Sequence, residues 1–492
     1  MFIRRSAIIT PFRKPPSRPI PLETLTAMQD KTIVIKSLDK DARGVGHLEN
    51  EDGTPGKVVF VEGALPGERV SFETFRKKKN WEAARMTALH KESSMRVKPK
   101  CVHFDYCGGC SMQHLEPSAQ VAIKQRTLED DLWHLSKVKA GNMMRPLYGP
   151  AWGYRYRARL SSRYVAKKGT VLVGFHEKKS VYVADIQSCQ ILPPHVSDMM
   201  MPLRALIGSL SIFDKVPQIE LAIGEETTVL VMRNMEALTA DDETKLKAFA
   251  DQYRIQWWLQ PKGPDTVYPF YPLDKELYYL LPEFGVKMPF KPTDFTQVNH
   301  HINRVLVAKA LRLLDVQKED RVADLFCGLG NFTLPLATQA REVVGIEGST
   351  TLTERALANA QVNGVAAKTT FQTRNLFEVT KDDLIALGKF DRMLIDPPRD
   401  GAMALSLALA ELKKDAPELL PKRIVYVSCS PSTLARDAGV LTHLCGYKLD
   451  LAGVVNMFPH TSHVESMAVF NLDPDAKIRE LPMARVQETV GE

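Results

Sequence analysis

Apolar residues change their spacing along the chain, and these changes predict three structured regions. Residues 30–90 have short apolar runs separated by glycine and proline, which predicts four or five strands and an OB-like β-barrel over 29–90. Residues 91–296 combine further strands with helical apolar spacing at 111–140 and 240–252, which predicts a β-rich central domain. The predicted strands of this central region include 171–175, 181–184 and 228–232.

The third region, residues 297–476, alternates between helical and continuous apolar patterns. Repeated strand–helix units predict an α/β fold with a Rossmann-like, doubly wound sheet of parallel strands. The predicted strands are 321–326, 343–347, 369–373, 393–396, 424–428 and 467–471. The predicted helices are 302–314, 332–340 and 351–363. Residues 1–28 are rich in proline and arginine and are expected to form a flexible extension, and residues 477–492 a separate tail.

Positive charge is concentrated in two segments, although the whole chain carries a net charge of only +7. Residues 71–100 contain nine Lys or Arg and three Glu, and residues 151–170 contain six Lys or Arg and no acidic residue. Such segments favour a polyanionic partner, although a solvated basic surface would have the same composition. We take 76–100 and 155–168 as candidate contacts to nucleic acid. Alternation predicts one shared strand face for Arg155, Arg157 and Arg159.

Composition indicates the cellular compartment in which we expect the protein. The chain has no apolar run of roughly 18 residues, and its first residues lack the pattern of a secretory signal, so we expect no membrane association. It has seven cysteines, an odd number in a long chain, which argues against a disulfide framework. We therefore expect a cytoplasmic protein that uses its thiols for metal binding or catalysis. No obligate protein partner is evident.

A glycine-containing loop follows the first predicted strand of the third region. Residues 324–331 read Asp-Leu-Phe-Cys-Gly-Leu-Gly-Asn, and Glu347 ends the next strand, where a carboxylate can accept hydrogen bonds from ribose hydroxyls. Thr333 stands where a dinucleotide fingerprint has its third glycine, which favours S-adenosylmethionine over NAD. Polar residues at 374–375 and 396–399 follow two further strands and suit an adenosine ligand.

Cys429 lies directly after a predicted strand, at the same edge of the sheet as the glycine loop. Free cysteines are more often buried core residues, but the Ser and Pro that follow this one end the strand and favour an exposed position. A thiolate that adds to carbon 6 of uracil makes carbon 5 nucleophilic enough to attack a methyl donor. A base must then remove the proton on carbon 5, and Glu465 precedes the last predicted strand.

Four other cysteines suggest a metal centre. Cys101, Cys107 and Cys110 follow a C-x5-C-G-G-C pattern, and Cys189 lies 79 residues further on. Four thiols suit either a tetrahedral zinc ion or a 4Fe-4S cluster. The absence of a second C-x2-C pair makes a zinc ribbon the weaker alternative, and four unrelated cysteines would be the simplest one.

These motifs give the chain a family resemblance over about residues 30–475. It resembles the bacterial RNA uridine-5 methyltransferases, and among them the iron–sulfur type that acts on 23S rRNA. The motifs that carry the resemblance are the TRAM-like barrel, the cysteine pattern 101–114, and the segments 294–299, 324–332, 395–401, 428–431 and 463–470.

The resemblance implies a role for each candidate residue. Cys429 is implied as the nucleophile and Glu465 as the base. The implied S-adenosylmethionine site consists of Gln297, Phe326, Asn331, Glu347, Asn375 and Asp396, of which Asn375 is placed with the least certain spacing. The implied 4Fe-4S ligands are Cys101, Cys107, Cys110 and Cys189. The family also implies that the helical stretch 111–140 packs on the methyltransferase domain.

The combination of barrel and cluster implies 23S rRNA as the substrate. Methylation of a second rRNA uridine or of tRNA by the same chemistry is the first alternative. A DNA cytosine-5 methyltransferase would place its cysteine after the fourth strand, where this chain has Asp396, Pro397 and Pro398. A non-catalytic iron–sulfur RNA-binding protein is the second alternative, and the presence of both Cys429 and Glu465 argues against it.

Overall fold

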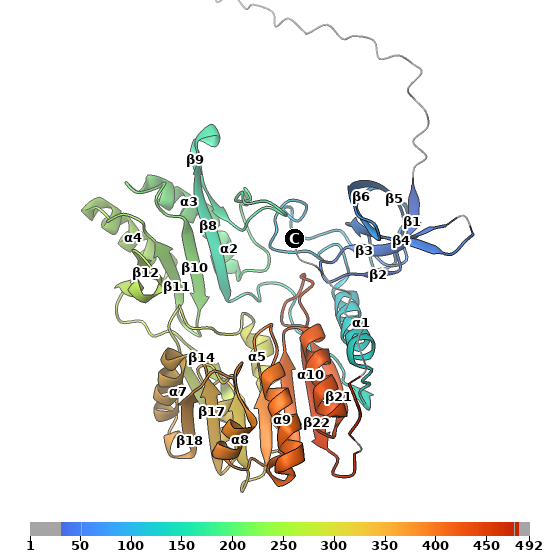
Figure 1. Ribbon diagram of the computed structural model, residues 1–492. Helices are drawn as coiled ribbons and strands as arrows, with labels where there is room; N and C mark the ends of the chain where they lie inside the picture. The colour runs from blue at the N-terminus through green and yellow to red at the C-terminus, as the bar shows by residue number, and fades with distance from the viewer. Residues whose placement is uncertain (1–30, 51, 477, 482–492) are drawn as a thin grey trace, which may run out of the picture. The chain divides into compact units, whose positions relative to one another are not determined.

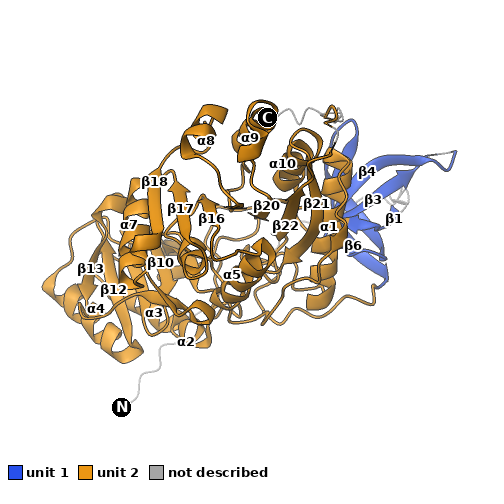
Figure 2. Cartoon of the chain, turned by 90° about the horizontal axis from the view of Figure 1, so that it is seen from below, with its two compact units in different colours: residues 1–37, 44–92 blue, residues 38–43, 93–492 orange. Residues whose placement is uncertain are grey.

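The chain forms two compact units in the computed structural model (Figures 1 and 2). The structure describes residues 31–50, 52–476 and 478–481. The first unit ends at Glu92, and the second contains everything described from Ser93 onward together with 38–43. The predicted extension over 1–28 lies outside the described residues, as does most of the predicted tail. Among the described helices, none has the length and apolar character needed to cross a membrane.

The first unit is a six-stranded sheet in the order β1-β5-β6-β4-β3-β2. Its strands are β1 (Thr32–Val34), β2 (Ser37–Leu38), β3 (Gly44–Glu49), β4 (Pro55–Glu62), β5 (Arg69–Lys77) and β6 (Trp81–Lys91). The two residues between β1 and β2 join both ends of this order, because Ile35 N donates to Glu68 O at 2.9 Å and Lys36 N to Val45 O at 2.8 Å. The sheet therefore closes around a small apolar core that includes Val59.

The second unit contains a six-stranded central sheet in the order β13-β12-β11-β10-β8-β9. Its strands are β8 (Arg157–Val165), β9 (Thr170–Gly174), β10 (Gln218–Ile223), β11 (Thr228–Arg233), β12 (Ile255–Gln260) and β13 (Tyr268–Tyr271). Helices α2 (Pro194–Asp198), α3 (Met200–Ser209) and α4 (Ala240–Tyr253) accompany it, and α3 and α4 bury Leu203 and Leu246 in its core (Figure 1). The predicted strand at 181–184 is wrong, because only Val183 forms an isolated bridge, to His176.

The second unit also contains an eight-stranded sheet in the order β18-β17-β16-β19-β20-β22-β21-β7. Its strands are β7 (Asn142–Met143), β16 (Arg321–Leu325), β17 (Glu342–Glu347), β18 (Thr369–Thr373), β19 (Arg392–Ile395), β20 (Arg423–Ser428), β21 (Tyr447–Val455) and β22 (Glu465–Leu472). The strands from β18 to β20 are parallel, whereas β22 runs antiparallel to both neighbours. The prediction of an all-parallel sheet is therefore corrected at its last strand. A separate hairpin of β14 (Tyr278–Leu281) and β15 (Val286–Pro289) precedes β16 in sequence.

Helices cover both faces of this sheet. They are α1 (Pro117–Ser136), α5 (His300–Leu314), α6 (Thr333–Ala337), α7 (Thr350–Val362), α8 (Lys381–Leu387), α9 (Met403–Asp415) and α10 (Pro431–His443). Strand side chains alternate between the faces. In β20, Ile424 and Tyr426 pack with α9 and α10, whereas Val425 and Val427 pack with α5 and α6. Figure 2 shows α8, α9 and α10 above the row of strands and α5 and α7 below it.

Helix α1 belongs to this layer although it precedes the central sheet in sequence. It begins with Pro117, and the Glu116 carboxylate caps it by accepting from the Ser118 and Ala119 amides. It buries Leu128 and Leu132 against the core beside α10. The helix is shorter than the predicted stretch 111–140, because the residues before Glu116 form an irregular segment. The part of the second unit that surrounds the eight-stranded sheet is therefore discontinuous in sequence, because α1 and β7 precede the central sheet and the other strands follow it.

Candidate active site

The loop after β16 has the backbone that close approach of a ligand requires. Phe326, Gly328 and Gly330 have positive φ values of 63°, 55° and 95°. Any Cβ at Gly330 would collide with Leu334 as well as adopt a strained φ. A positive φ at a phenylalanine costs energy and persists because the Phe326 N–H is held by Ile346 O at 2.8 Å. The loop therefore opens its backbone toward the carboxyl edge of the sheet.

Glu347 is fixed at the end of β17 by two backbone amides. Gly328 N donates to Oε2 at 3.2 Å, and Ser349 N donates to Oε1 at 3.1 Å. The side chain is half-buried at the rim of a cavity. Its orientation leaves acceptor capacity for ligand hydroxyls, because a carboxylate has about four lone-pair positions.

Asn331 is fixed by partners that the sequence did not indicate. Its Oδ1 accepts from Tyr279 OH at 2.8 Å and from Asn303 Nδ2 at 2.9 Å, while its Nδ2 donates to Asn303 Oδ1 at 3.0 Å. Burial raises the pKa of Tyr279, so the phenol stays a donor. Tyr279 comes from β14, which carries no recognisable motif. Only the fold brings it to the loop.

All eight predicted active-site residues line one cavity of about 830 Å³, a volume within the range typical of small-molecule sites. They are Cys429 and Glu465 together with Gln297, Phe326, Asn331, Glu347, Asn375 and Asp396. The cavity also takes in Arg155, Tyr279 and Phe458, to which the sequence assigned no role in this site, and Arg399 and His463, which the sequence placed only within longer motifs. The carboxyl ends of the five parallel strands β16 to β20 and the loops that carry 295–297 and 458–463 thus meet around one space.

Burial favours the protonated forms of the acidic groups in this cavity. Desolvation, followed by the Glu465 and Asp396 carboxylates, raises the pKa of Cys429 to about 11, and Arg399 opposes the increase. Burial, and then Asp396, hold the pKa of Glu465 well above its usual range. Burial alone raises the pKa of Asp396 to about 7. A cation in the cavity would favour the charged form of all three groups and lower each pKa.

The three alternating arginines do not share a face as predicted. Strand β8 begins only at Arg157, whose Nη2 donates to Pro292 O at 2.8 Å and is structural. Arg159 is exposed and forms an ion pair with Glu220 at 3.0 Å. Arg155 precedes the strand and lines the active-site cavity instead. The three side chains therefore have three different environments.

The four predicted metal-binding cysteines, Cys101, Cys107, Cys110 and Cys189, line a second, smaller cavity. Within the described residues, no three His, Cys, Asp or Glu side chains are grouped tightly enough to hold a single ion. Burial raises the pKa of Cys110 to about 12 and that of Cys189 to about 11.

The two glycines between Cys107 and Cys110 allow this loop to pack closely. A Cβ at Gly108 would lie 2.9 Å from His176 O, and Gly108 N donates to that same oxygen at 2.8 Å. A Cβ at Gly109 would lie 3.2 Å from the Phe175 ring. Side chains at these positions would therefore push the cysteine loop away from the cavity wall.

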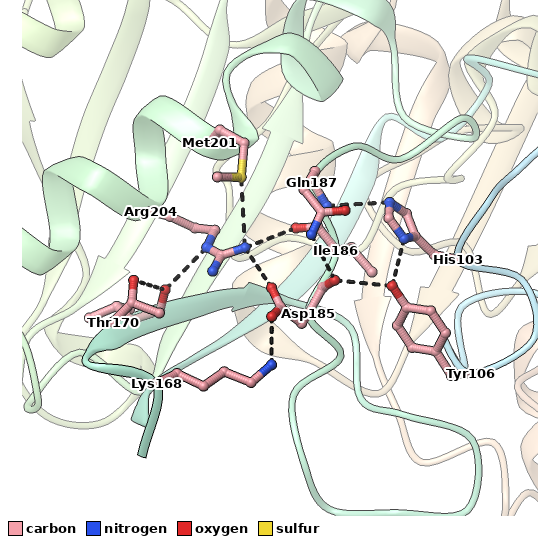
Figure 3. A network of polar contacts seen from close by, with 10 residues as sticks. His103, Tyr106, Lys168, Thr170, Asp185, Ile186, Gln187, Met201 and Arg204 are labelled. Atoms are coloured by element: carbon pink, nitrogen blue, oxygen red, sulfur yellow. Dashed lines mark hydrogen bonds and ion pairs between the residues drawn. The ribbon is translucent and has the colours of Figure 1, made fainter. Parts of the chain in front are cut away.

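A polar network joins the cysteine loop to the segment that carries the fourth cysteine (Figure 3). His103 accepts from Gln187 N at 3.3 Å through Nε2, so its Nδ1 donates to Tyr106 OH at 2.7 Å. Tyr106 OH in turn donates to Asp185 O at 3.1 Å. The Asp185 carboxylate forms an ion pair with the buried Arg204 at 2.8 Å. The network fixes both walls of the cavity independently of any metal.

Comparison with known proteins agrees with this geometry. The family model described as tRNA (Uracil-5-)-methyltransferase matches residues 284–472. The chain is 69% identical over 441 residues to the 23S rRNA (uracil(1939)-C(5))-methyltransferase RlmD of Cupriavidus pinatubonensis, covering 90% of this chain and 95% of the relative. It is 67% identical over 442 residues to the RlmD of Ralstonia pickettii, covering 89% and 98%.

The fold is similar to that of a solved relative. The Pyrococcus abyssi tRNA (uracil-54, C5)-methyltransferase in complex with S-adenosyl-L-homocysteine has a TM-score of 0.67 and 24% identity, covering 89% of this chain and all of that one. This likeness supports the methyltransferase fold. The two RlmD relatives match this chain over nearly their whole length. The chain belongs to the RNA uracil-C5 methyltransferase family, in the branch whose members are named RlmD.

Proposed function

We propose that this protein transfers a methyl group from S-adenosylmethionine to carbon 5 of a uridine in 23S rRNA, with Cys429 as the nucleophile and Glu465 as the base. The observation that carries the proposal is the single cavity in which both residues meet the six predicted donor-site side chains. The relatives at 67–69% identity, which are named for this reaction on 23S rRNA, support the substrate class. The target base must leave any stack to enter such a cavity.

The proposed reaction balances in three steps. The Cys429 thiol releases its proton to solvent, to be taken up again when the thiolate leaves, and its sulfur bonds to carbon 6, which moves the C5–C6 electron pair toward carbon 5. Carbon 5 then attacks the donor methyl group, and the bond from methyl to the sulfonium breaks to leave S-adenosylhomocysteine. Glu465 removes the proton from carbon 5, the C5–C6 double bond re-forms, and the Cys429 thiolate leaves. The net change replaces hydrogen by methyl and releases one proton.

The electrostatics of the cavity support this order of binding and reaction. Burial raises the pKa values of Cys429, Glu465 and Asp396, and the nearby carboxylates add to the increase at Cys429 and Glu465. A sulfonium is a cation, and its arrival favours the thiolate and the carboxylates. The site thus becomes competent when the donor is present, which limits reaction of a bare thiolate with other molecules.

RNA binding is proposed for the first unit and for the basic segment 155–168. The closed sheet of the first unit supports the proposal of a TRAM barrel, and its residues 76–79 are all exposed. Arg76 lies 5.5 Å from the centroid of the Trp81 ring, which holds the guanidinium outward on a stacking platform. In the second segment, Arg159 and Lys168 are exposed, each beside one carboxylate. These groups would contact phosphates in a salt-dependent manner.

A 4Fe-4S cluster is proposed for the cysteine cavity. Four thiols that line one space provide the number of ligands that such a cluster takes, and a bound cation would overcome the burial that keeps Cys110 and Cys189 protonated. When bound, such a cluster supplies a rigid, four-point anchor or a redox centre. The proposed methyl transfer contains no redox step, so we assign the cysteines a structural role.

Metal content tests the cluster. Protein purified without oxygen is expected to be brown and to contain about four irons per chain. Cys189→Ser is expected to lose most of the iron and the visible absorbance, because one of four ligands is missing. Cys445→Ala is the matched control, since Cys445 is fully buried elsewhere and its sulfur lies 3.6 Å from Ser406 O. Stoichiometric zinc without iron would exclude the cluster.

Mapping of 5-methyluridine tests the substrate. A strain that lacks the protein is expected to lose a 5-methyluridine from 23S rRNA, and the wild-type gene, but not one encoding Cys429→Ala, is expected to restore it. The same strain's tRNA is the internal comparison. If tRNA loses the modification while 23S rRNA keeps every 5-methyluridine, the proposed substrate class is wrong.

A further inference from the structure

The loop that joins β21 to β22, residues 456–464, determines where the proposed base lies. Glu465 is the first residue of β22 and is almost completely buried. Phe458 and His463 in the loop line the active-site cavity, and their rings lie 5.6 Å apart. Any displacement of this loop would therefore move the base and one wall of the cavity together.

Helix α1 holds the loop with two fully buried polar side chains. Lys124 Nζ donates to Asn456 Oδ1 at 2.8 Å and to Phe458 O at 2.9 Å. Gln120 Oε1 accepts from His460 N at 2.8 Å. Buried polar groups are retained where they make specific hydrogen bonds, because leaving them unpaired is costly. These two therefore fix the loop to the helix.

The segment directly after the third cavity cysteine holds the same loop. Ser111 N and Met112 N both donate to His460 O at 2.9 Å, and Ser462 N donates to Ser111 Oγ at 3.1 Å. The Gln120 amide joins the two attachments, because its Nε2 donates to Met112 O at 2.9 Å. Ser111 is separated from Cys110 by one peptide bond. A shift of Cys110 is therefore transmitted directly to the loop.

His460 is the point on which these contacts meet. Its φ is 64°, a left-handed conformation that is unfavourable for a residue with a side chain. Its ring stacks on Trp152 with the centroids 3.9 Å apart, and its Nδ1 lies 3.1 Å from Gln120 Nε2. Burial lowers its pKa to about 4, which keeps the ring neutral and able to accept this bond. The surrounding contacts hold a conformation that an isolated loop would leave.

We propose that Ser111, Gln120 and His460 form a positioning clamp through which the cysteine cavity holds the loop 456–464, and with it Glu465, in the active site. None of the three lines the active-site cavity, so they are positioning residues and not catalytic ones. The clamp rests on the proposed function for its consequence in catalysis, but its structure does not depend on methyl transfer. It gives the cysteine centre a task in an enzyme whose reaction has no redox step.

Amide hydrogen exchange on the full-length protein, purified without oxygen, tests the clamp directly. Gln120→Ala is expected to speed exchange at residues 456–464 by at least about tenfold, with no change in β18, because local opening controls exchange. Cys189→Ser, which loosens the cavity from its far side, is expected to do the same. Gln125→Ala is the matched control, because Gln125 lies on the same helix and its side-chain amide donates to Glu129, which belongs to that helix as well.

Kinetics supply a second readout that a general loss of folded protein would not give. Gln120→Ala is expected to lower kcat about 10- to 100-fold with KM within about threefold, and to accumulate an SDS-stable protein–RNA adduct, because a misplaced Glu465 slows only the last step. Ser111→Ala removes one hydrogen bond at a less buried position, so it tests the same direction if Gln120→Ala does not fold. It is expected to give a smaller effect of the same kind.

Unchanged loop exchange in both Gln120→Ala and Cys189→Ser would overturn the clamp, even if activity falls. Faster loop exchange, combined with an absence of adduct in every variant and of methylation in the wild type, would instead refute the proposed function and leave the clamp in place. The two proposals therefore fail in different ways.

Discussion

Cys429→Ala is expected to abolish methyl transfer, with a loss of at least about 10⁴-fold, while binding of 23S rRNA fragments stays within about threefold of wild type. Carbon 5 of uracil is a poor nucleophile until a thiolate adds to carbon 6, and alanine offers nothing that can add. The side chain is small and half-buried, so its loss leaves the rest of the cavity lining in place. Methylation is measured by transfer of labelled methyl groups, and binding by titration at several salt concentrations.

Cys445→Ala provides the control for this result. Cys445 is a core residue between α10 and β21, and it lies outside both cavities. Its replacement is expected to lower stability modestly and to leave the rate per folded molecule unchanged. Formation of 5-methyluridine by Cys429→Ala at a rate above the enzyme-free background would show that another nucleophile, or none, is used. Loss of RNA binding in that variant would show that the thiol also contributes to recognition.

Most strands of the eight-stranded sheet can be predicted from the sequence, because they are short and buried and are separated by helices. The strand predicted at 321–326 and the glycine loop after it occur where the pattern places them. Strand direction cannot be read from an apolar run, so the antiparallel course of β22 was missed. Strand β21 was missed as well, because its burial pattern contains a register shift between Leu449 and Leu451 that breaks the period.

Site residues that directly follow parallel strands could be predicted from the sequence. Site residues that reach the cavity only through the packing of distant segments could not. The carboxyl ends of parallel strands meet at one edge, so Glu347, Asp396 and Cys429 could be expected together. Tyr279 reaches the same cavity from a hairpin without any motif. Arg155 has a local alternation that suggested a strand face, but the strand begins two residues later. Sequence spacing describes a neighbourhood along the chain, whereas the cavity is assembled from segments as far apart in the chain as Arg155 and Glu465.

Glu465→Gln is expected to stop the reaction after methyl transfer and to leave the RNA attached to the protein. Glutamine has the same shape as glutamate but cannot take the proton from carbon 5, so the double bond cannot re-form and the thiolate cannot leave. One equivalent of S-adenosylhomocysteine is expected per enzyme, with multiple turnover slowed about 10²- to 10⁴-fold. An SDS-stable protein–RNA band with a methylated uridine measures the trapped species. The double variant Cys429→Ala/Glu465→Gln is expected to give no band.

The pH dependence of the adduct distinguishes Glu465 from any other base in the cavity. Burial and Asp396 hold the pKa of Glu465 well above its usual range. Lowering the pH of the wild-type reaction therefore protonates Glu465, which can then no longer take the proton from carbon 5. The wild type is therefore expected to accumulate adduct as the pH falls and to release it as the pH rises. Glu465→Gln has no carboxyl group to titrate, so its adduct is expected to persist across the same range. An adduct in Glu465→Gln that is released at high pH as in the wild type would assign the proton transfer to a different residue, for which His463 is a candidate because it lines the same cavity.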